Sequence, residues 1–166
     1  PCPQSVYGRT KLLGEEAIRH TGCHALILRT SWLYAPYGAN FMKTMLLLGK
    51  ERPEMRVVFD QVGTPTSALD LARFIVGIIE RRQLDKTGLY HFSNEGVCSW
   101  YDFAVEILKL AGSDCKVIPC RTEEFPTPAS RPAYSVLDKA KIKTDFNFPI
   151  PYWRDSLVSL MTNYKL

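Results

Sequence analysis

The sequence lacks the marks of several large classes of protein. No apolar run approaches the about 20 residues that a membrane-spanning helix needs, and no signal peptide is visible. The 21 basic and 17 acidic residues are scattered, and Arg81-Arg82 is the only adjacent basic pair, which argues against a nucleic-acid-binding stripe. We therefore expect a cytoplasmic protein with no membrane contact and no nucleic-acid partner.

Cysteine patterns typical of metal sites and disulfide frameworks are absent too. The five cysteines (Cys2, Cys23, Cys98, Cys115 and Cys120) are odd in number and irregularly spaced, and no Cys-x2-Cys pair occurs. Only three histidines accompany them. This pattern argues against a zinc site and favours reduced thiols, so we predict no metal ligands.

A start methionine is also missing. The chain opens on Pro1-Cys2-Pro3 and runs at once into a helical pattern, so we expect it to be a piece of a longer protein. Its 166 residues, 46% apolar and 23% charged, are still enough to bury a sizeable core. Length alone favours one domain, with room for an appendage.

The helical pattern at the start carries a chemical motif, Tyr7-x3-Lys11. Residues four apart lie on one face of a helix, one turn from each other. A free tyrosine has a pKa near 10, about three units too high for proton transfer at neutral pH, and an adjacent ammonium lowers that value by favouring the phenolate. The pair therefore builds a tunable acid, although the same spacing also arises by chance on amphipathic helices.

The apolar periodicity predicts an alternation of helices and short strands. A helix is predicted from Ser5, its N-cap, to about His20, with Gly22 as the residue that ends it. Gly14 lies inside this helix at a cost of about 1 kcal/mol relative to alanine, which indicates close packing against a neighbouring backbone. Residues 24–28 are a predicted buried strand of a parallel sheet. The later elements expected are helices at 41–50, 67–82, 100–111, from 138, and 151–163, and strands at 56–59, 88–92 and 116–119.

This order indicates an α/β protein in two parts. Residues 1–36 are expected to be the tail of a larger parallel-sheet domain whose earlier strands are missing. Residues 37–166 are expected to be mainly a small mixed α+β lobe, with some elements returning to that sheet, and a ligand cleft lies between the parts. A loop at 126–132, fixed by prolines, is expected to hold Arg131 over a pocket.

Several motifs together resemble a known family. They are Tyr7-Gly8-Arg9-Thr10-Lys11 with Gly14-Glu15, Arg29-Thr30-Ser31-Trp32-Leu33-Tyr34, Gly38-Ala39-Asn40-Phe41, Asp60-Gln61-Val62-Gly63-Thr64-Pro65-Thr66, Ser99-Trp100-Tyr101-Asp102-Phe103-Ala104 and Pro126-Thr127-Pro128-Ala129-Ser130-Arg131-Pro132. The series resembles the extended short-chain dehydrogenase/reductases that act on nucleotide sugars, and within them the dTDP-4-dehydrorhamnose reductase family. The family's Gly-x-x-Gly-x-x-Gly turn and the hydroxyl residue of its Ser/Thr-Tyr-Lys triad have no counterpart here. The chain therefore resembles a C-terminal portion: the end of a Rossmann domain plus the sugar-binding lobe.

The resemblance implies a reaction and roles for individual residues. Hydride passes from NADPH, or NADH, to the C4 ketone of dTDP-4-dehydro-L-rhamnose, and the fragment alone is expected to be inactive. The resemblance implies that Tyr7 donates the proton, and that Lys11 binds the nicotinamide ribose and lowers the pKa of Tyr7. It implies that Thr30 and Ser31 contact the cofactor. It also implies that Trp32 packs against the sugar and that Asn40 and Arg131 contact the diphosphate. A homodimer, with magnesium in some members, is also implied, although no carboxylate cluster here requires the metal.

Two other functions remain open on the sequence. One is a regulatory binding subunit of the same fold without turnover, and the other is a different nucleotide-sugar epimerase or dehydratase. Retention of Tyr7, Lys11 and Trp32 favours an enzyme over a scaffold. A dehydratase would need further acid and base residues beside the missing hydroxyl residue.

Overall fold

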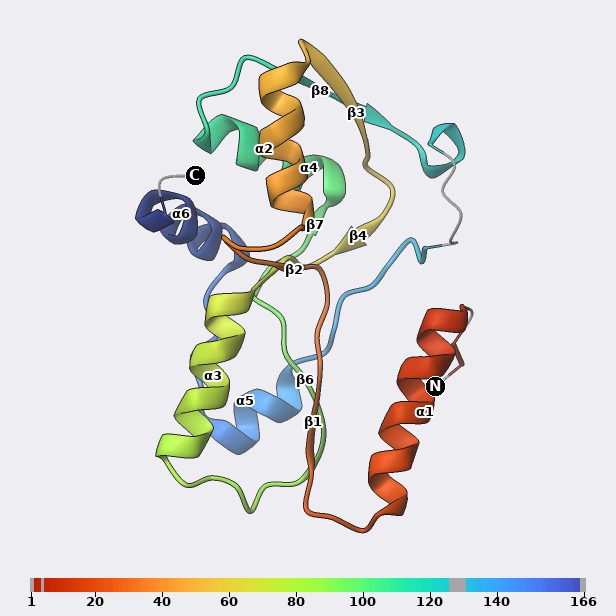
Figure 1. Cartoon of the computed structure of the whole chain (residues 1–166), viewed down its shortest axis with the longest axis vertical. Coiled ribbons are helices and arrows are strands. Elements are labelled where there is room, and N and C mark those ends of the chain that lie inside the picture. The colour runs from red at the N-terminus through yellow and green to blue at the C-terminus, as the bar shows by residue number, and fades with distance from the viewer. Residues whose placement is uncertain (1, 4, 126–130, 165–166) are drawn as a thin grey trace.

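The computed structural model describes residues 2–3, 5–125 and 131–164, and Figure 1 shows their arrangement. The helices are α1 (Val6–His20), α2 (Phe41–Glu51), α3 (Ala68–Glu80), α4 (Trp100–Leu110), α5 (Ala140–Phe146), α6 (Trp153–Tyr164) and the 3-10 helix η1 (Thr122–Glu124). The strands are β1 (Leu26–Arg29), β2 (Leu33–Tyr34), β3 (Glu54–Val58), β4 (Val62–Gly63), β5 (Thr66–Ser67), β6 (Gly88–His91), β7 (Cys98–Ser99) and β8 (Lys116–Cys120). No helix in these ranges has the length and apolar character needed to cross a bilayer.

The strands form two-stranded pairs between segments that are distant in the sequence. The pairs β1–β6, β2–β5 and β3–β8 are parallel, and β4–β7 is antiparallel. In the longest parallel pair, Glu54 of β3 lies opposite Lys116 of β8. The predicted α/β class is thereby confirmed, with parallel strands joined through helices.

Two hydrophobic clusters form the core. The first gathers β2, β3, α2, α4 and α6, and the second gathers β6, α3 and α5. Figure 1 shows the elements of the first cluster in the upper half of the molecule and those of the second in the lower half. The first is built on Tyr34, Met42, Phe103 and Leu157, which are almost fully buried, and Phe74 lies at the centre of the second.

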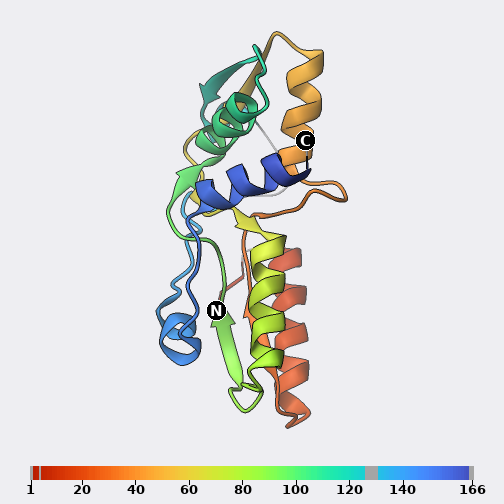
Figure 2. The same ribbon diagram turned by 90° about the vertical axis from the view of Figure 1, so that its left-hand side faces the viewer.

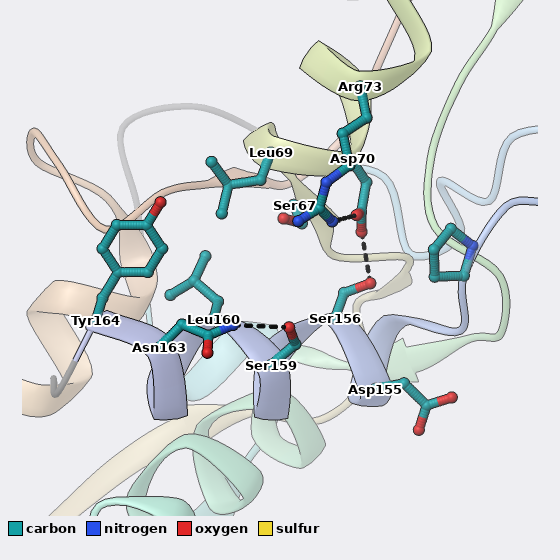
Figure 3. Close-up of a pocket in the computed structure, with 11 residues that line it drawn as sticks. Ser67, Leu69, Asp70, Arg73, Asp155, Ser156, Ser159, Leu160, Asn163 and Tyr164 are labelled. Carbon is teal, nitrogen blue, oxygen red and sulfur yellow. Dashed lines mark hydrogen bonds and ion pairs between the residues drawn. The ribbon is translucent and has the colours of Figure 1, made fainter. Parts of the chain in front are cut away.

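A buried polar network lies where the two halves meet. The Asn94 Nδ2 group donates to Asp70 Oδ2 at 2.8 Å and lies 2.9 Å from Ser156 Oγ, while the Ser67 backbone N–H donates to Asn94 Oδ1 at 2.7 Å. The Ser156 hydroxyl and the Arg73 guanidinium point at the Asp70 carboxylate from α6 and α3 (Figure 3). Figure 2 shows α6 running across the junction. These bonds satisfy polar groups that would otherwise destabilise the fold.

The sequence predicts N-caps at Ser5, at Asn40, at Thr66 or Ser67, and at Ser99, and the caps at Ser5, Asn40 and Ser99 are confirmed, whereas Ser67 precedes α3 without a capping bond from its side chain. The Ser5 hydroxyl accepts from the Gly8 N–H, Asn40 Oδ1 accepts from the Lys43 N–H, and Ser99 forms a capping box with Asp102. Gly22 follows α1 with a φ of 68°, the left-handed conformation that favours glycine after a helix. Capping hydrogen bonds and a left-handed glycine therefore set where these helices begin or end.

Two sequence expectations about α1 are wrong. The spacing of its apolar residues, such as Val6, Leu13 and Ile18, predicts one buried face, yet within this chain none of its residues is buried, and Val6 and Leu13 are 74% and 57% exposed. Gly14 was expected to face a close backbone, yet nothing lies within 4 Å of the position of an added Cβ. In Figure 1, α1 stands at the right-hand side of the lower half, outside both hydrophobic clusters.

Candidate functional site

Tyr7 and Lys11 lie on the same side of α1. The Lys11 Nζ atom is 5.6 Å from the centroid of the Tyr7 ring, and the Tyr7 side chain is 72% exposed. In the part of the chain that the structure describes, neither side chain forms a hydrogen bond or an ion pair. The phenol and the ammonium are therefore free to contact a ligand together.

The two side chains open into a cavity of about 680 Å³ between α1 and β1, which we call the Tyr7 cavity. Thr30, the residue after β1, lines the same cavity. Glu15 and Arg29 also line it and bind each other through two hydrogen bonds. The structure therefore brings together three of the predicted site residues: Tyr7, Lys11 and Thr30.

Trp32 has a constrained geometry. Its backbone φ is 48°, a left-handed conformation that costs a non-glycine residue about 1 kcal/mol or more. Its indole stacks on that of Trp100, with ring centroids 3.6 Å apart and an interplanar angle of 8°. A Cβ at Gly63 would lie 2.6 Å from an atom of the Trp32 ring. Gly63 and Trp100 together therefore fix the position of this indole.

A second cavity of about 200 Å³, the Trp32 cavity, lies beside this stack. Ser31, Trp32 and Arg131 all line it. Thr30 and Ser31 are consecutive, so the residues at the exit of β1 line both the Tyr7 cavity and the Trp32 cavity. The Ser31 hydroxyl donates to the carbonyl oxygen of Thr64 at 3.2 Å.

A third cavity of about 560 Å³, the Phe41 cavity, continues from the Trp32 cavity along α2 and β3. The two cavities share Gln61, Trp100 and Arg131. The wall formed by Phe41 and other apolar side chains suits a flat ring, and Arg131 supplies a permanent positive charge. Arg131 itself is exposed, and the loop predicted to hold it falls largely on residues 126–130, outside the described residues.

Asn40 is the predicted site residue that lines none of these three cavities. Its Oδ1 atom accepts from the Lys43 N–H at 3.2 Å, and its Nδ2 group donates to the Ala35 carbonyl at 2.8 Å. The amide therefore caps α2 and ties it to the preceding loop. Its predicted contact with a diphosphate stays a prediction.

Sequence reasoning missed Gln61 as a site residue, although it stands inside one of the motifs quoted above. Gln61 is 5% exposed, and its Nε2 group donates to Thr122 Oγ1 at 3.1 Å. The single hydroxyl proton of Thr122 goes to Asp60 Oδ1 at 2.7 Å, so Thr122 can only accept from Gln61. The Thr122 backbone N–H also donates to the Asp60 carboxylate, at 3.0 Å, and this bond, followed by the bond from the hydroxyl, lowers the pKa of the Asp60 carboxyl. These hydrogen bonds fix the orientation of the Gln61 amide, with its Nε2 group toward Thr122.

A further cavity of about 480 Å³ lies between the start of α3 and α6 (Figure 3). Its polar side chains, such as Asp70 and Ser156, belong to the network at the junction, and it contains none of the predicted site residues. Within the described ranges, no group of three or more His, Cys, Asp or Glu side chains is placed to hold a metal ion. The Tyr7, Trp32 and Phe41 cavities are therefore the candidate site.

Comparison with known proteins identifies the family. The family described as "RmlD substrate binding domain" matches residues 1–166, the whole chain. The chain belongs to the RmlD family. The resemblance to dTDP-4-dehydrorhamnose reductases is confirmed: the enzyme of that name from Sinorhizobium fredii is 41% identical over 162 residues, which cover 93% of this chain and 55% of that protein. The spore coat polysaccharide biosynthesis protein SpsK of Bacillus subtilis is 42% identical over 155 residues, 93% of this chain and 53% of that protein.

A solved structure of the RmlD family supports the fold. The dTDP-4-dehydrorhamnose reductase of Bacillus anthracis, determined in complex with NADP, matches with a TM-score of 0.91 and 40% identity. The match covers 98% of this chain and 56% of that one. The chain thus spans about half the length of the RmlD-family relatives that it matches.

Proposed function

We propose that the full-length protein containing this chain reduces dTDP-4-dehydro-L-rhamnose to dTDP-L-rhamnose. NADPH supplies a hydride to C4 of the sugar, and Tyr7 supplies a proton to the C4 oxygen, so that the ketone becomes a hydroxyl. Negative charge develops on that oxygen as the carbonyl bond breaks, and a positioned acid lowers the barrier by meeting it. The other residues of the site bind and orient the reactants.

The placement of Tyr7 and Lys11 carries this proposal. The two side chains share one cavity with Thr30, and the Lys11 Nζ atom lies 5.6 Å from the centroid of the phenol ring. The Trp32 cavity, lined by the next residue along the chain, Ser31, supplies a space of about 200 Å³ for a sugar ring. An acid with a neighbouring cation at one side of the β1 exit, and an aromatic wall at the residues that follow, suit the reduction of a sugar ketone.

The chemistry of the Tyr7 cavity fits the nicotinamide end of the cofactor. The Lys11 ammonium has three N–H donors and, among the described residues, no hydrogen-bond partner. These donors suit the hydroxyls of a ribose, and the ammonium orients the phenol beside it. The glycine-rich turn that would hold the pyrophosphate has no counterpart in residues 1–166. Only one end of the cofactor would therefore rest on this chain.

The remaining cavities suit the nucleotide sugar. Trp32 and Trp100 present aromatic surface to the apolar face of a 6-deoxy sugar, and the Phe41 cavity has room for a flat base. Arg131, which lines both cavities, is placed between these parts and suits the diphosphate through paired donors and permanent charge. Asn40 remains a second proposed diphosphate contact, beside its role as a helix cap.

The decisive experiment measures NADPH oxidation by the full-length protein with dTDP-4-dehydro-L-rhamnose, and identifies the product. Replacing Tyr7 by Phe removes the proton donor, so we expect kcat to fall by roughly 100- to 10,000-fold. Tyr37, which is 71% exposed, provides the matched control, because Tyr37→Phe removes an equally exposed phenol outside the Tyr7 cavity. An unchanged rate in Tyr7→Phe would contradict the proposal.

The same assay separates the two alternatives. A full-length protein that binds NADPH but reduces no dTDP- or UDP-linked 4-keto sugar would indicate a regulatory binding subunit. Conversion of a nucleotide sugar without net oxidation of NADPH would indicate an epimerase or a dehydratase. The proposed function requires one equivalent of NADPH for each equivalent of reduced sugar.

A further inference from the structure

A bidentate ion pair joins α1 to the end of β1. The Arg29 Nε group donates to Glu15 Oε1 at 2.6 Å, and the Arg29 Nη2 group donates to Glu15 Oε2 at 2.7 Å. The Glu15 side chain is 12% exposed and the Arg29 side chain is 31% exposed. Two parallel bonds from a planar guanidinium fix the orientation of the carboxylate as well as its distance.

This pair connects α1 to β1 through polar side chains. Among the described residues, no other side-chain hydrogen bond or ion pair leads from α1 to another element, and no residue of α1 is buried. Within this chain, the bond between Glu15 and Arg29 is therefore the side-chain link that sets the direction of α1 relative to β1.

The two residues of the pair also lie close in the sequence to residues of the proposed site. Tyr7, Lys11 and Glu15 follow each other at intervals of four residues, which places them along one side of the helix. Arg29 directly precedes Thr30, and all five residues line the Tyr7 cavity. The bond thus holds the helix that carries the phenol against the strand exit that leads to Trp32.

We propose that Glu15 and Arg29 are positioning residues, which hold Tyr7 and Lys11 at the distance from Thr30 and Trp32 that proton delivery requires. This inference rests on the proposed reduction. Tyr7 lies about 12 Å along the helix axis from Glu15, so a tilt of about 5° at the pair displaces the phenol by about 1 Å. A displacement of about 1 Å can cost roughly 100-fold in rate.

The charges around Glu15 support an ionised carboxylate in this role. The hydrogen bond from Arg29 lowers the pKa of Glu15, and Arg19 and His91 contribute in the same direction. Arg19 belongs to α1 and lies 3.4 Å from Glu15 Oε2, whereas His91 belongs to β6. The pair is therefore charged at neutral pH and available to hold the helix.

The test uses Glu15→Gln in the full-length protein, with Glu16→Gln as the matched control that removes the same charge one residue away. We expect Glu15→Gln to lower kcat by about 10- to 100-fold and to change KM for the sugar by less than about threefold. Because proton transfer becomes slower, the solvent deuterium isotope effect on kcat should rise. Glu16→Gln should change none of these quantities.

A second measurement keeps the test independent of the substrate. Amide hydrogen exchange across residues 6–20 should accelerate in Glu15→Gln and in Arg29→Lys, but not in Glu16→Gln, because the helix loses its attachment. Normal exchange in Glu15→Gln would overturn the inference whatever the substrate is. Altered exchange with an unchanged kcat and isotope effect would also overturn it, because the pair would then be structural only. Failure of the proposed function appears differently, as a wild-type protein that reduces no 4-keto sugar.

Discussion

The indole rings of Trp32 and Trp100 lie face to face, with centroids 3.6 Å apart and planes 8° from parallel. The partners come from the exit of β1 and the first residue of α4, which are far apart in the sequence. The Phe41 ring lies beside the stack, with its centroid 4.5 Å from that of Trp100 and its plane tilted by 49°. The Trp32 cavity and the Phe41 cavity therefore share an aromatic wall, whose position depends on the glycine packed against it.

We predict that Gly63→Ala displaces this wall. The added Cβ would lie 2.6 Å from an atom of the Trp32 ring and 2.7 Å from Ser135 Oγ, so both must move. Overpacking of this kind costs about 1–3 kcal/mol in the free energy of unfolding. The near-ultraviolet circular dichroism of the stacked indoles should weaken, and KM for the sugar nucleotide should rise.

The control for this substitution is Gly77→Ala in α3. Nothing lies within 4 Å of the Cβ position at Gly77, and alanine is favoured over glycine inside a helix by about 1 kcal/mol. Gly77→Ala should therefore raise the unfolding temperature and leave the indole signal unchanged. A Gly63→Ala protein with the wild-type indole spectrum would show that Gly63 does not set the position of Trp32.

We predict that Ser156→Ala destabilises the junction between the two halves. The Ser156 hydroxyl donates to Asp70 Oδ2 and also lies 2.9 Å from the Asn94 amide. Removing it leaves a buried carboxylate short of a donor, which costs about 1–3 kcal/mol. Chemical denaturation of wild type and variant measures the difference. Ser159→Ala, on the exposed side of the same helix, should change stability by less than about 0.5 kcal/mol, and equal losses in the two variants would contradict the network's role.

Local patterns were enough to predict the helices. The spacing of Leu71, Phe74 and Ile78 predicted a helix at 67–82, and α3 occupies Ala68–Glu80. Capping side chains such as Asn40 and Ser99 act within four residues, so the sequence shows them directly. The strands β3 and β6 were also predicted within two residues, because short stretches rich in β-branched and aromatic residues mark them.

Features that depend on distant partners were not predictable. The two-residue strands β2, β4, β5 and β7 exist only through pairing across the chain, and no local pattern marks them. The site residues also fall into those that local spacing places and those that only the tertiary fold brings together. Helical spacing was enough to place Tyr7 beside Lys11, whereas the contact of Trp32 with Trp100 requires the tertiary fold. Gln61 was missed because its orientation depends on Thr122, far along the chain.

We predict that the cysteines differ sharply in reactivity. Burial raises the pKa of the Cys98 thiol to about 12, with a smaller contribution from Asp102, so very little thiolate forms at neutral pH. Cys23 is exposed. Alkylation at about pH 8 should modify Cys23 in the native protein and Cys98 only after unfolding, as peptide mass spectrometry can show. Native Cys98 that reacts as fast as Cys23 would contradict the buried position.

The final prediction concerns the acid stability contributed by the Glu15–Arg29 pair. The hydrogen bond from Arg29 makes the pKa of Glu15 lower in the folded protein than in the unfolded chain, where it is about 4.3. A carboxyl of this kind stabilises the fold above its unfolded pKa, and the stabilisation is lost as the pH falls through the folded pKa. At neutral pH, wild type should therefore exceed Glu15→Gln by about 1–3 kcal/mol in the free energy of unfolding.

This difference should begin to shrink as the pH falls below the unfolded pKa of about 4.3, where the unfolded chain starts to bind a proton, and it should be lost once the pH is below the lowered pKa of folded Glu15. Denaturation of wild type and Glu15→Gln across the acid range measures the difference directly, and Glu16→Gln reports any general effect of a lost negative charge. The same hydrogen bond raises the pKa of Arg29, so Arg29 stays protonated across the whole acid range. A difference that disappears above the ordinary carboxyl pKa would mean that the pair does not hold α1 as an ion pair.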